Sequence, residues 1–315
     1  MPARRGCRLD QSHSQEFIQH LINGVSLGSI YALIALGYTM VYGILQLINF
    51  AHSEVYMVGA FAAYYVGSNK WLALTDHQGI GALIVLLIAA IAACSLLGVT
   101  IERLAYRPLR KAPKLNILIT AIGVSLLLQY SGQIIFGSDP KLFPEVIKDI
   151  TLFQIGGVEV HSLDVTILVV GTLVMLGLHF LVQHTKIGTA MRAVSSNEMV
   201  ARLMGINVNR IISFTFIIGS SLAGVASVLV GLKYPKIDPL MGMLFGLKAF
   251  VAAVLGGIGS LPGAMLGGVL LGLCEEMVVG YISSTYRDAL AFGILIVILL
   301  FRPAGLLGSV QREKV

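Results

Sequence analysis

Long apolar segments alternate with short polar ones along most of the chain. A helix needs about 20 apolar residues to cross a bilayer. Five segments meet this need with little interruption: 80–101, 115–136, 163–183, 211–232 and 288–301 with its flanks. Two longer apolar regions, 17–67 and 246–281, each contain one interruption. The pattern predicts an all-α, polytopic transmembrane helix bundle of about eight spans, and ten shorter spans are the alternative.

The first interruption brings Asn49, His52, Ser53 and Glu54 into an apolar region. Non-helical backbone at membrane depth persists only where it is buried in protein or lines a wet cavity, and an ionisable residue there is usually functional. We therefore predict a broken or re-entrant helix near 49–54, with Asn49, His52 and Glu54 at a translocation path or gate. A short cytoplasmic turn capped by Asn49 and Ser53 is the alternative.

The second interruption is the glycine-rich stretch GGIGSLPGAMLGG at 256–268. Glycine and proline disrupt helices, so we predict a second broken helix near 256–263, with Gly256 and Gly259 at the gate. The small residues that follow are spaced for close helix packing; they are Gly263, Gly267, Gly268 and Gly272.

Other polar residues in the apolar regions allow two interpretations each. Tyr31, Tyr38 and Tyr42 form a stripe at helix-like spacing, which lines the path or packs at an interface. We include Tyr38 and Tyr42 among the path or gate positions. Glu275 and Glu276 line a cavity or face the outer membrane interface, and we favour the outer interface.

The segment 186–210, KIGTAMRAVSSNEMVARLMGINVNR, has the composition of a short soluble helix although it lies between two apolar segments. Its apolar residues recur at near-helical spacing, with charged and amide residues between them. Such a segment is longer than a connection between two spans requires. It indicates a docking surface for a soluble partner, and a helix lying on the membrane surface is the alternative.

Composition and charge place these elements relative to a membrane. The 315 residues are 56% hydrophobic and 12% charged, whereas soluble domains carry about 25% charged residues. The net charge of +6 is therefore interpreted by location and not as a nucleic-acid signal. Basic residues concentrate in 102–114, 184–210 and the two tails. The positive-inside rule then predicts that the tails 1–16 and 302–315 are both cytoplasmic and flank a permease domain at 17–301.

This orientation has two further consequences. It requires an odd number of crossings within 17–67 and an even number within 246–281. It also assigns 233–248 to the outside, although that segment contains Lys233, Lys236 and Lys248.

The sequence lacks the common catalytic and nucleotide-binding motifs. It contains no Gly-x-x-x-x-Gly-Lys-Ser/Thr, His-Glu-x-x-His or Cys-x-x-Cys. We therefore predict no catalytic residues, no metal site and no cofactor in this chain.

Several stretches together resemble the permease subunits of branched-chain amino acid ABC importers, the H-type (LivH-like) permeases. They are 24–60, 186–210, LAGVASVL at 222–229 and GLKAFVAAVLGGIGSLPGAMLGG at 246–268. Segment 186–210 is also similar to the EAA loop of ABC permeases through Glu198, Ala201 and Gly205. The spacing differs by one residue, and Met199 and Val200 replace the paired alanines.

The resemblance implies a multi-pass subunit of the bacterial inner membrane that takes up leucine, isoleucine and valine, with phenylalanine or other neutral amino acids as the alternative substrates. Its partners would be a similar second permease, two cytoplasmic ATP-binding subunits that hold ATP and magnesium, and a periplasmic amino-acid-binding protein. Thr189 to Gly205 would be the coupling helix, with Met199, Leu203 and Met204 as buried anchors and with polar rim contacts from Arg192, Asn197, Glu198 and Arg202. A proton-coupled carrier that uses His52 and Glu54, or a passive channel for small solutes, is the alternative.

Overall fold

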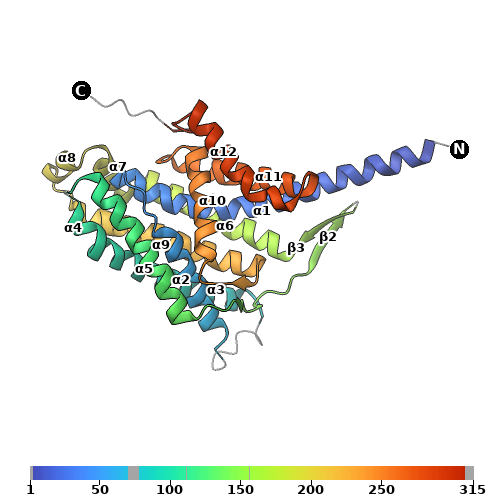
Figure 1. The fold of residues 1–315 in the computed structure, drawn as a ribbon, viewed down its shortest axis with the longest axis horizontal. Coiled ribbons are helices and arrows are strands. Elements are labelled where there is room, and N and C mark those ends of the chain that lie inside the picture. The colour runs from blue at the N-terminus through green and yellow to red at the C-terminus, as the bar shows by residue number, and fades with distance from the viewer. Residues whose placement is uncertain (1–2, 70–77, 111, 156, 309–315) are drawn as a thin grey trace.

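The computed structural model describes residues 3–69, 78–110, 112–155 and 157–308, which are almost entirely helical (Figure 1). The helices are α1 Ala3–Leu45, α2 His52–Gly67, α3 Ile80–Ile101, α4 Arg107–Leu109, α5 Lys114–Phe136, α6 Ser162–His184, α7 Lys186–Ser196, α8 Glu198–Leu203, α9 Val208–Lys233, α10 Met241–Gly256, α11 Leu261–Tyr281 and α12 Arg287–Phe301. A π-helical turn, Glu102–Tyr106, links α3 to α4, and a 3₁₀ turn, Ser284–Tyr286, precedes α12. The strands are β1 Lys141–Leu142, β2 Thr151–Ile155, β3 Val158–His161 and β4 Lys236–Ile237.

The helical membrane fold predicted from the apolar pattern is confirmed. Seven helices within the described ranges are long and apolar enough to cross a membrane, and α10 is a shorter apolar helix. Both predicted breaks occur. Helix α1 ends at Leu45 and α2 begins at His52, while α10 ends at Gly256 and α11 begins at Leu261. Antiparallel pairing of β1 with β4 and of β2 with β3 is confined to the connections.

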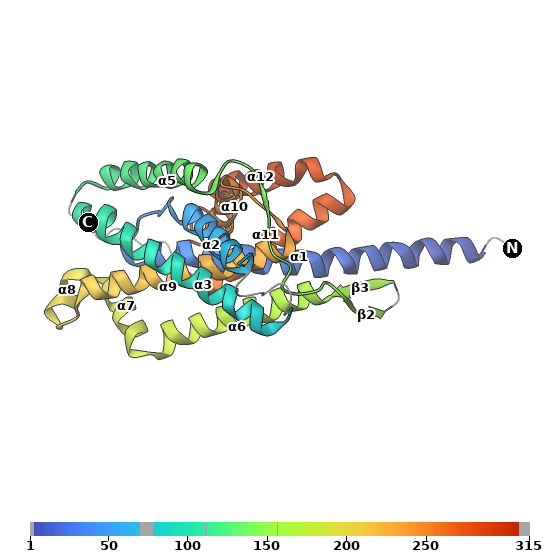
Figure 2. The same cartoon turned by 90° about the horizontal axis from the view of Figure 1, so that it is seen from below.

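The bundle has two opposite faces, which we name by the elements that mark them. Helices α7 and α8 lie at one end and the β2–β3 hairpin lies at the other (Figure 2). The α7–α8 face also carries the turn 257–260 and the segment 302–308, and the hairpin face carries the β1–β4 pair. Contacts that define the α7–α8 face are Arg110 to Asn209, Ser195 to Gly43 and Leu306 to Leu255, and Gln19 contacts Glu159 on the hairpin face.

Helix α1 runs the full distance from the hairpin face to the α7–α8 face (Figure 1). Helix α2 then returns the chain to the hairpin face, where Gly67 lies against Pro144. Region 17–67 therefore crosses twice, although the charge pattern required an odd number. Residues 302–308 lie on the α7–α8 face, at the other end of the bundle from the start of α1, and the cytoplasmic placement of both tails stays a prediction. Residues 3–16, predicted as a tail, belong to α1.

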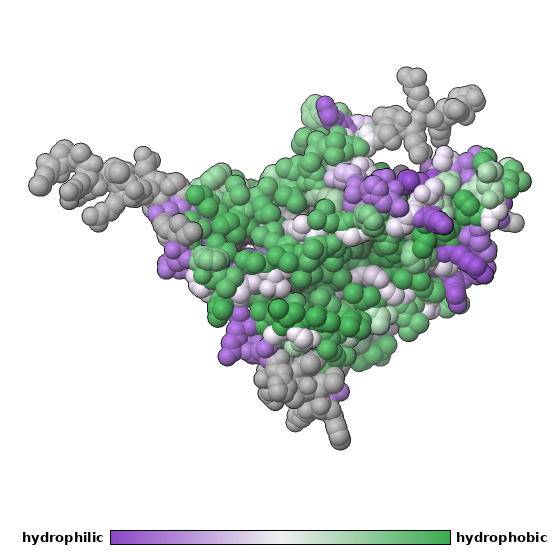
Figure 3. All heavy atoms as spheres, turned by 180° about the vertical axis from the view of Figure 1, so that it is seen from behind, coloured by the Kyte–Doolittle hydropathy of each residue, from purple (hydrophilic) through white to green (hydrophobic). Residues whose placement is uncertain are grey.

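Helices α1 and α9 form the centre of the bundle. Their most apolar stretches are 94% and 83% buried, whereas those of α5 and α12 are 17% and 6% buried. A broad apolar band covers the middle of the molecule, and hydrophilic residues gather towards its ends (Figure 3). The exposed apolar side chains of the outer helices are thus placed to face lipid or another membrane subunit.

Helices α1 and α11 pack closely through glycines. A methyl group on Gly272 would lie 2.3 Å from the backbone nitrogen of Gly28, and one on Gly268 would lie 2.4 Å from the backbone nitrogen of Ala32. Such distances leave no room for a side chain between the two backbones, which is how small residues act in membrane helix pairs. Gly263 and Gly267 make similar approaches to α10, at Gly256 and Ala252.

Replacing Gly268 with alanine is expected to destabilise the bundle by about 1–3 kcal/mol, the usual cost of overpacking. The matched control is Gly123→Ala in α5, where an added methyl meets nothing within 4 Å. That control should be neutral or stabilising by up to about 1 kcal/mol through helix propensity. Unfolding of purified variants with sodium dodecyl sulfate in mixed micelles measures both changes. Equal stability of the two variants would contradict close α1–α11 packing.

Candidate functional site

The first break is a buried polar cluster. Asn49, His52 and Glu54 are each 3% exposed or less. The hydroxyl of Tyr106, in the π-helical turn after α3, donates to Asn49 Oδ1 at 2.9 Å. On α5, Ser125 lies at the limit of hydrogen-bond distance from Glu54, at 3.4 Å. Within the connection between α1 and α2, Asn49 and Ala51 are buried, as non-helical backbone within a membrane requires, whereas Gln46 at its start is exposed.

His52 is wedged against α1. Its ring meets the Tyr38 ring edge-on, with 4.8 Å between centroids, and a methyl on Gly37 would lie 2.2 Å from His52 Nε2. His52 Nε2 and Glu54 Oε2 are buried without a hydrogen-bond partner. No ion pair joins His52 to Glu54 among the described residues. Buried polar atoms without partners are rare in folded proteins, so they mark this break as a candidate functional position.

The second break lies nearer the α7–α8 face. Gly257 and Gly259 adopt φ values of 105° and 95°, a left-handed backbone region that glycine enters without a steric penalty. The Ser260 side chain caps α11 by accepting the backbone N–H of Gly263 at 3.2 Å. Gly256 packs against the backbone of Gly263. The break is thus a tight turn between α10 and α11 and not a loop.

The segment after α12 supports this turn. The backbone N–H groups of Leu306 and Leu307 donate to the carbonyls of Leu255 and Gly256, both at 2.9 Å. These carbonyls end α10 and have no partner within the helix. Residues 302–308 are therefore an integral part of the second break.

The predicted path or gate residues form two groups in the structure. Tyr38 lies with Asn49, His52 and Glu54, whereas Tyr42 lies 4.0 Å from a methyl built on Gly259, beside the second break. Phe250 of α10 packs against the first group, since its ring lies 6.2 Å from Tyr38 and 6.3 Å from Phe50, centroid to centroid. Helix α10 crosses the line of α1 steeply between the two breaks (Figure 1).

Segment 186–210 forms two helices instead of one. Thr185 caps α7 by accepting from the N–H of Gly188 at 3.1 Å, and Asn197 caps α8 by accepting from Val200 at 3.1 Å. Asn197 therefore ends one helix and starts the next. Gly205 follows α8 with a φ of 82°, which reverses the chain into α9.

The two helices differ in what they contact. Helix α7 buries Met191 and Val194, and Arg192 donates to the carbonyl oxygens of Val182 and Gln183 at the end of α6. Arg192 thus holds α7 to its own bundle, and its predicted rim contact to a partner stays a prediction. Ala201 is also buried.

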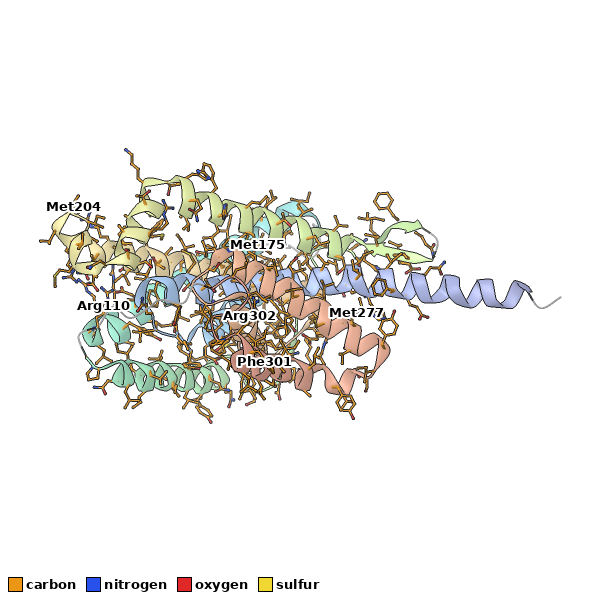
Figure 4. All side chains as sticks on the ribbon, turned by 90° about the horizontal axis from the view of Figure 1, so that it is seen from above. Arg110, Met175, Met204, Met277, Phe301 and Arg302 are labelled. Atoms are coloured by element: carbon orange, nitrogen blue, oxygen red, sulfur yellow. The ribbon has the colours of Figure 1, made fainter. Side chains whose placement is uncertain are left out.

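Helix α8 presents its apolar side chains outward. Met199 and Leu203 are 73% and 81% exposed, and an ion pair joins Glu198 to Arg202 beside them. Met204, 77% exposed, lies at the tip of the molecule, far from the start of α1 (Figure 4). Large apolar side chains exposed together at one end indicate a surface that another protein covers.

A charged network that the sequence analysis missed joins α10, α11 and α12. Lys248 is 6% exposed and its Nζ lies 2.7 Å from both Glu275 Oε1 and Asp288 Oδ1. Arg287 pairs with Glu275 at 2.5 Å and with Glu276 at 2.8 Å. Lys248 therefore lies within α10 and not in an outer loop, and the Glu275 side chain faces the protein interior. A lysine inside the apolar run GLKAFVAAVLG, with two adjacent carboxylates in the next helix, was the available signal.

Metal-ligand geometry does not occur in the described part of the chain, where no group of three histidine, cysteine, aspartate or glutamate residues could hold an ion. The candidate site instead consists of two broken helices inside a membrane bundle, with an exposed apolar surface on α8 at one end. Broken helices with buried polar groups are how membrane permeases build a path, and this arrangement defines the class as a membrane permease.

A family model described as "Branched-chain amino acid transport system / permease component" matches residues 20–299. The chain therefore belongs to this family. It is 45% identical over 306 residues to the high-affinity branched-chain amino acid transport system permease protein BraD of Pseudomonas aeruginosa, which covers 95% of this chain and 98% of that protein. It is 44% identical over 306 residues to the LivH permease protein of the same kind of system in Escherichia coli K12, with the same coverage. A solved structure entitled "An inward-facing conformation of a putative metal-chelate type ABC transporter" aligns with 89% of this chain and 85% of that one, at a TM-score of 0.43 and 16% identity.

Proposed function

We propose that the chain is the membrane-spanning permease subunit of an ATP-driven importer of leucine, isoleucine and valine in the bacterial inner membrane. The family and the near-complete match to BraD support this function. The observation that carries the ATP-driven part is the exposed apolar surface of α8. The sequence of this subunit has no nucleotide-binding motif. It therefore needs a surface to which an ATPase subunit binds and through which ATP hydrolysis moves the permease.

The α7–α8 face is then cytoplasmic. Arginine and lysine residues concentrate in 102–114 and 184–210, which flank this face, as the positive-inside rule requires. Two ATP-binding subunits would dock here, one on each permease of a pair, and would hold ATP and magnesium. The start of α1 and the β2–β3 hairpin then face the periplasm, where the amino-acid-binding protein delivers its cargo.

Movement of α7 and α8 reaches the second break directly. The Ser195 hydroxyl donates to the carbonyl of Gly43 at the end of α1, beside Tyr42 and Gly259. Helix α10 connects this region to the cluster of Asn49, His52 and Glu54 through Phe250. We infer that the two breaks act as the inner and middle parts of one gate, which the coupling helices open and close.

Reconstitution of the chain with its second permease, the ATPase subunits and the binding protein tests this function. Leucine uptake and leucine-stimulated ATP hydrolysis are expected only when all components are present. His52→Ala and Glu54→Gln should each lower uptake while ATPase subunits remain bound, because both side chains lie at the gate and far from α8.

Other outcomes would identify the rival classes. Uptake by the permease alone under a pH gradient would show a proton-coupled carrier, and a leak without ATP would show a channel. Full uptake in both the His52 and the Glu54 variants would remove these residues from the gate.

A further inference from the structure

A cavity of about 260 Å³ lies on the α7–α8 face, enclosed by α1, the end of α6, α7 and the start of α11. Its volume far exceeds the ~15 Å³ that one water needs and lies close to the ~300 Å³ at which ligand pockets begin. It shares Gly43, Ser195, Gly259 and Ser260 with a wider cavity of about 580 Å³ that reaches the segment 303–307. The smaller cavity is therefore accessible from the same face as the coupling helices.

One side of this cavity is apolar. Its walls come from four different elements, so no single helix accounts for them; the residues are Met40, Ile44, Val182, Met191, Leu261 and Pro262. Short aliphatic and thioether side chains of this kind fit a small branched hydrocarbon group and adapt to its shape.

The other side of the cavity has an unused polar group. Thr39 lines the cavity, is 1% exposed, and its hydroxyl has no hydrogen-bond partner. Other helical threonines of this chain satisfy the hydroxyl on the carbonyl four residues earlier; they are Thr100, Thr120, Thr166 and Thr215. An unpaired buried hydroxyl is energetically unfavourable, so a ligand whose acceptor reaches Thr39 gains by pairing with it.

The charge of the cavity lining favours an anionic ligand. Arg192 supplies a positive charge, and no aspartate or glutamate occurs among the described residues that line the cavity. The hydrogen bonds of Arg192 to Val182 and Gln183 use Nη1, and Nη2 donates to Thr189 Oγ1 at 3.5 Å, whereas a guanidinium carries five N–H donors. Donors therefore remain for a carboxylate, and the hydroxyls of Ser195 and Ser260 lie in the same lining.

We propose that this cavity binds a carboxylate carrying a short branched apolar chain and that the bound molecule restrains the coupling helix. The proposal rests on the proposed function, since the imported amino acids belong to this chemical class, as do the corresponding 2-oxo acids. Helix α7 contributes Met191, Arg192 and Ser195, and α1 contributes Thr39 and Gly43.

A ligand between α7 and α1 adds contacts that exist only while the two helices remain together. The bound ligand favours the conformation in which α7 stays against α1, because a ligand shifts an equilibrium towards the state it binds better. Imported amino acid that accumulates on the cytoplasmic face thereby slows further import.

Binding is tested with the assembled complex in nanodiscs, without the binding protein, so that only the membrane and ATPase subunits are present. The probes are leucine, 4-methyl-2-oxopentanoate and leucinamide. The first two distinguish an amino acid from a 2-oxo acid as the ligand, and at least one should bind. Leucinamide lacks the carboxylate and should bind at least about tenfold more weakly, as expected for a lost hydrogen bond to a charged group.

Two pairs of variants locate the site. Thr39→Val should weaken binding about three- to tenfold, the usual effect of removing one hydrogen bond, and Thr39→Ser should retain it. A methyl on Gly43 meets nothing closer than 4.0 Å, so Gly43→Leu should fill the cavity and abolish binding, while Gly43→Ala retains most of it. Binding that neither Thr39→Val nor Gly43→Leu changes would overturn the proposal.

Regulation is measured separately, as ATP hydrolysis stimulated by loaded binding protein. The ligand at the cytoplasmic face should slow hydrolysis in the wild type, and slow it less in Thr39→Val relative to that variant's own rate without ligand. Absence of inhibition, or a lipid chain that occupies the cavity and is not displaced by ligand, would overturn the proposal. A complex that imports branched-chain amino acids but binds no probe refutes this site alone, whereas a complex that imports none refutes the proposed function.

Discussion

Lys248→Met is expected to destabilise the bundle far more than Glu275→Gln, although the two side chains form one ion pair. Two cations, Lys248 and Arg287, face the three carboxylates of Glu275, Glu276 and Asp288. Without Lys248, one cation faces three carboxylates. Without the Glu275 charge, Lys248 keeps Asp288 and Arg287 keeps Glu276, so the remaining charges balance.

The expected losses follow from this asymmetry. Removing the cation from a buried network costs about 3–5 kcal/mol, because it leaves buried charge uncompensated. Exchanging the glutamate for a glutamine of the same shape should cost about 1 kcal/mol, the contribution of one hydrogen bond. Unfolding by sodium dodecyl sulfate in mixed micelles compares the two variants. Similar losses would show that Arg287 alone compensates Glu275.

Leu203→Asp should uncouple transport by preventing the ATPase subunit from docking. Leu203 is 81% exposed at the end of α8, so an aspartate there costs the permease little stability. In the complex the same position would be a buried anchor, and loss of such an anchor typically costs 2 kcal/mol or more, or about a 30-fold loss of affinity. Co-purification and titration of ATPase subunits with the permease measure this loss directly.

Phe153→Asp provides the matched control. Phe153 is 63% exposed on the hairpin face, at the other end of the molecule from α8. The same change of apolar side chain to carboxylate should leave ATPase binding intact there. If Leu203→Asp and Met199→Asp both retained ATPase binding and coupled uptake, α8 would not be the docking surface.

The sequence was sufficient for the helices and for both breaks, because each rests on a local signal. Continuous apolar runs require helix inside a bilayer. Polar residues such as Asn49 indicated the first break, and Gly257 and Gly259 indicated the second. The division of 186–210 at Asn197 was also available, since an asparagine directly before Glu198 is a helix-start signal.

Features that depend on distant parts of the chain were not available. The positive-inside rule counts charges and not crossings, so it could not show that the 16 residues of α2 return the chain to the hairpin face. Lys248 was assigned to the boundary of a span because the sequence did not show its buried partner, Glu275, which lies 27 residues away. The division of the gate residues into two groups likewise depends on the steep angle at which α10 crosses α1. The hydrophobic pattern of the sequence does not show that angle.

The close packing of α1 against α11 also bears on the order in which the bundle assembles during synthesis. Helix α1 leaves the ribosome first, yet Gly28 faces Gly272 from near the other end of the chain. The glycine surface of α1 has no helix to pack against until α11 has been inserted into the membrane. The early helices must therefore wait in the lipid as a loosely packed intermediate, and any slowing of translation after α9 lengthens the time in which membrane proteases can recognise it.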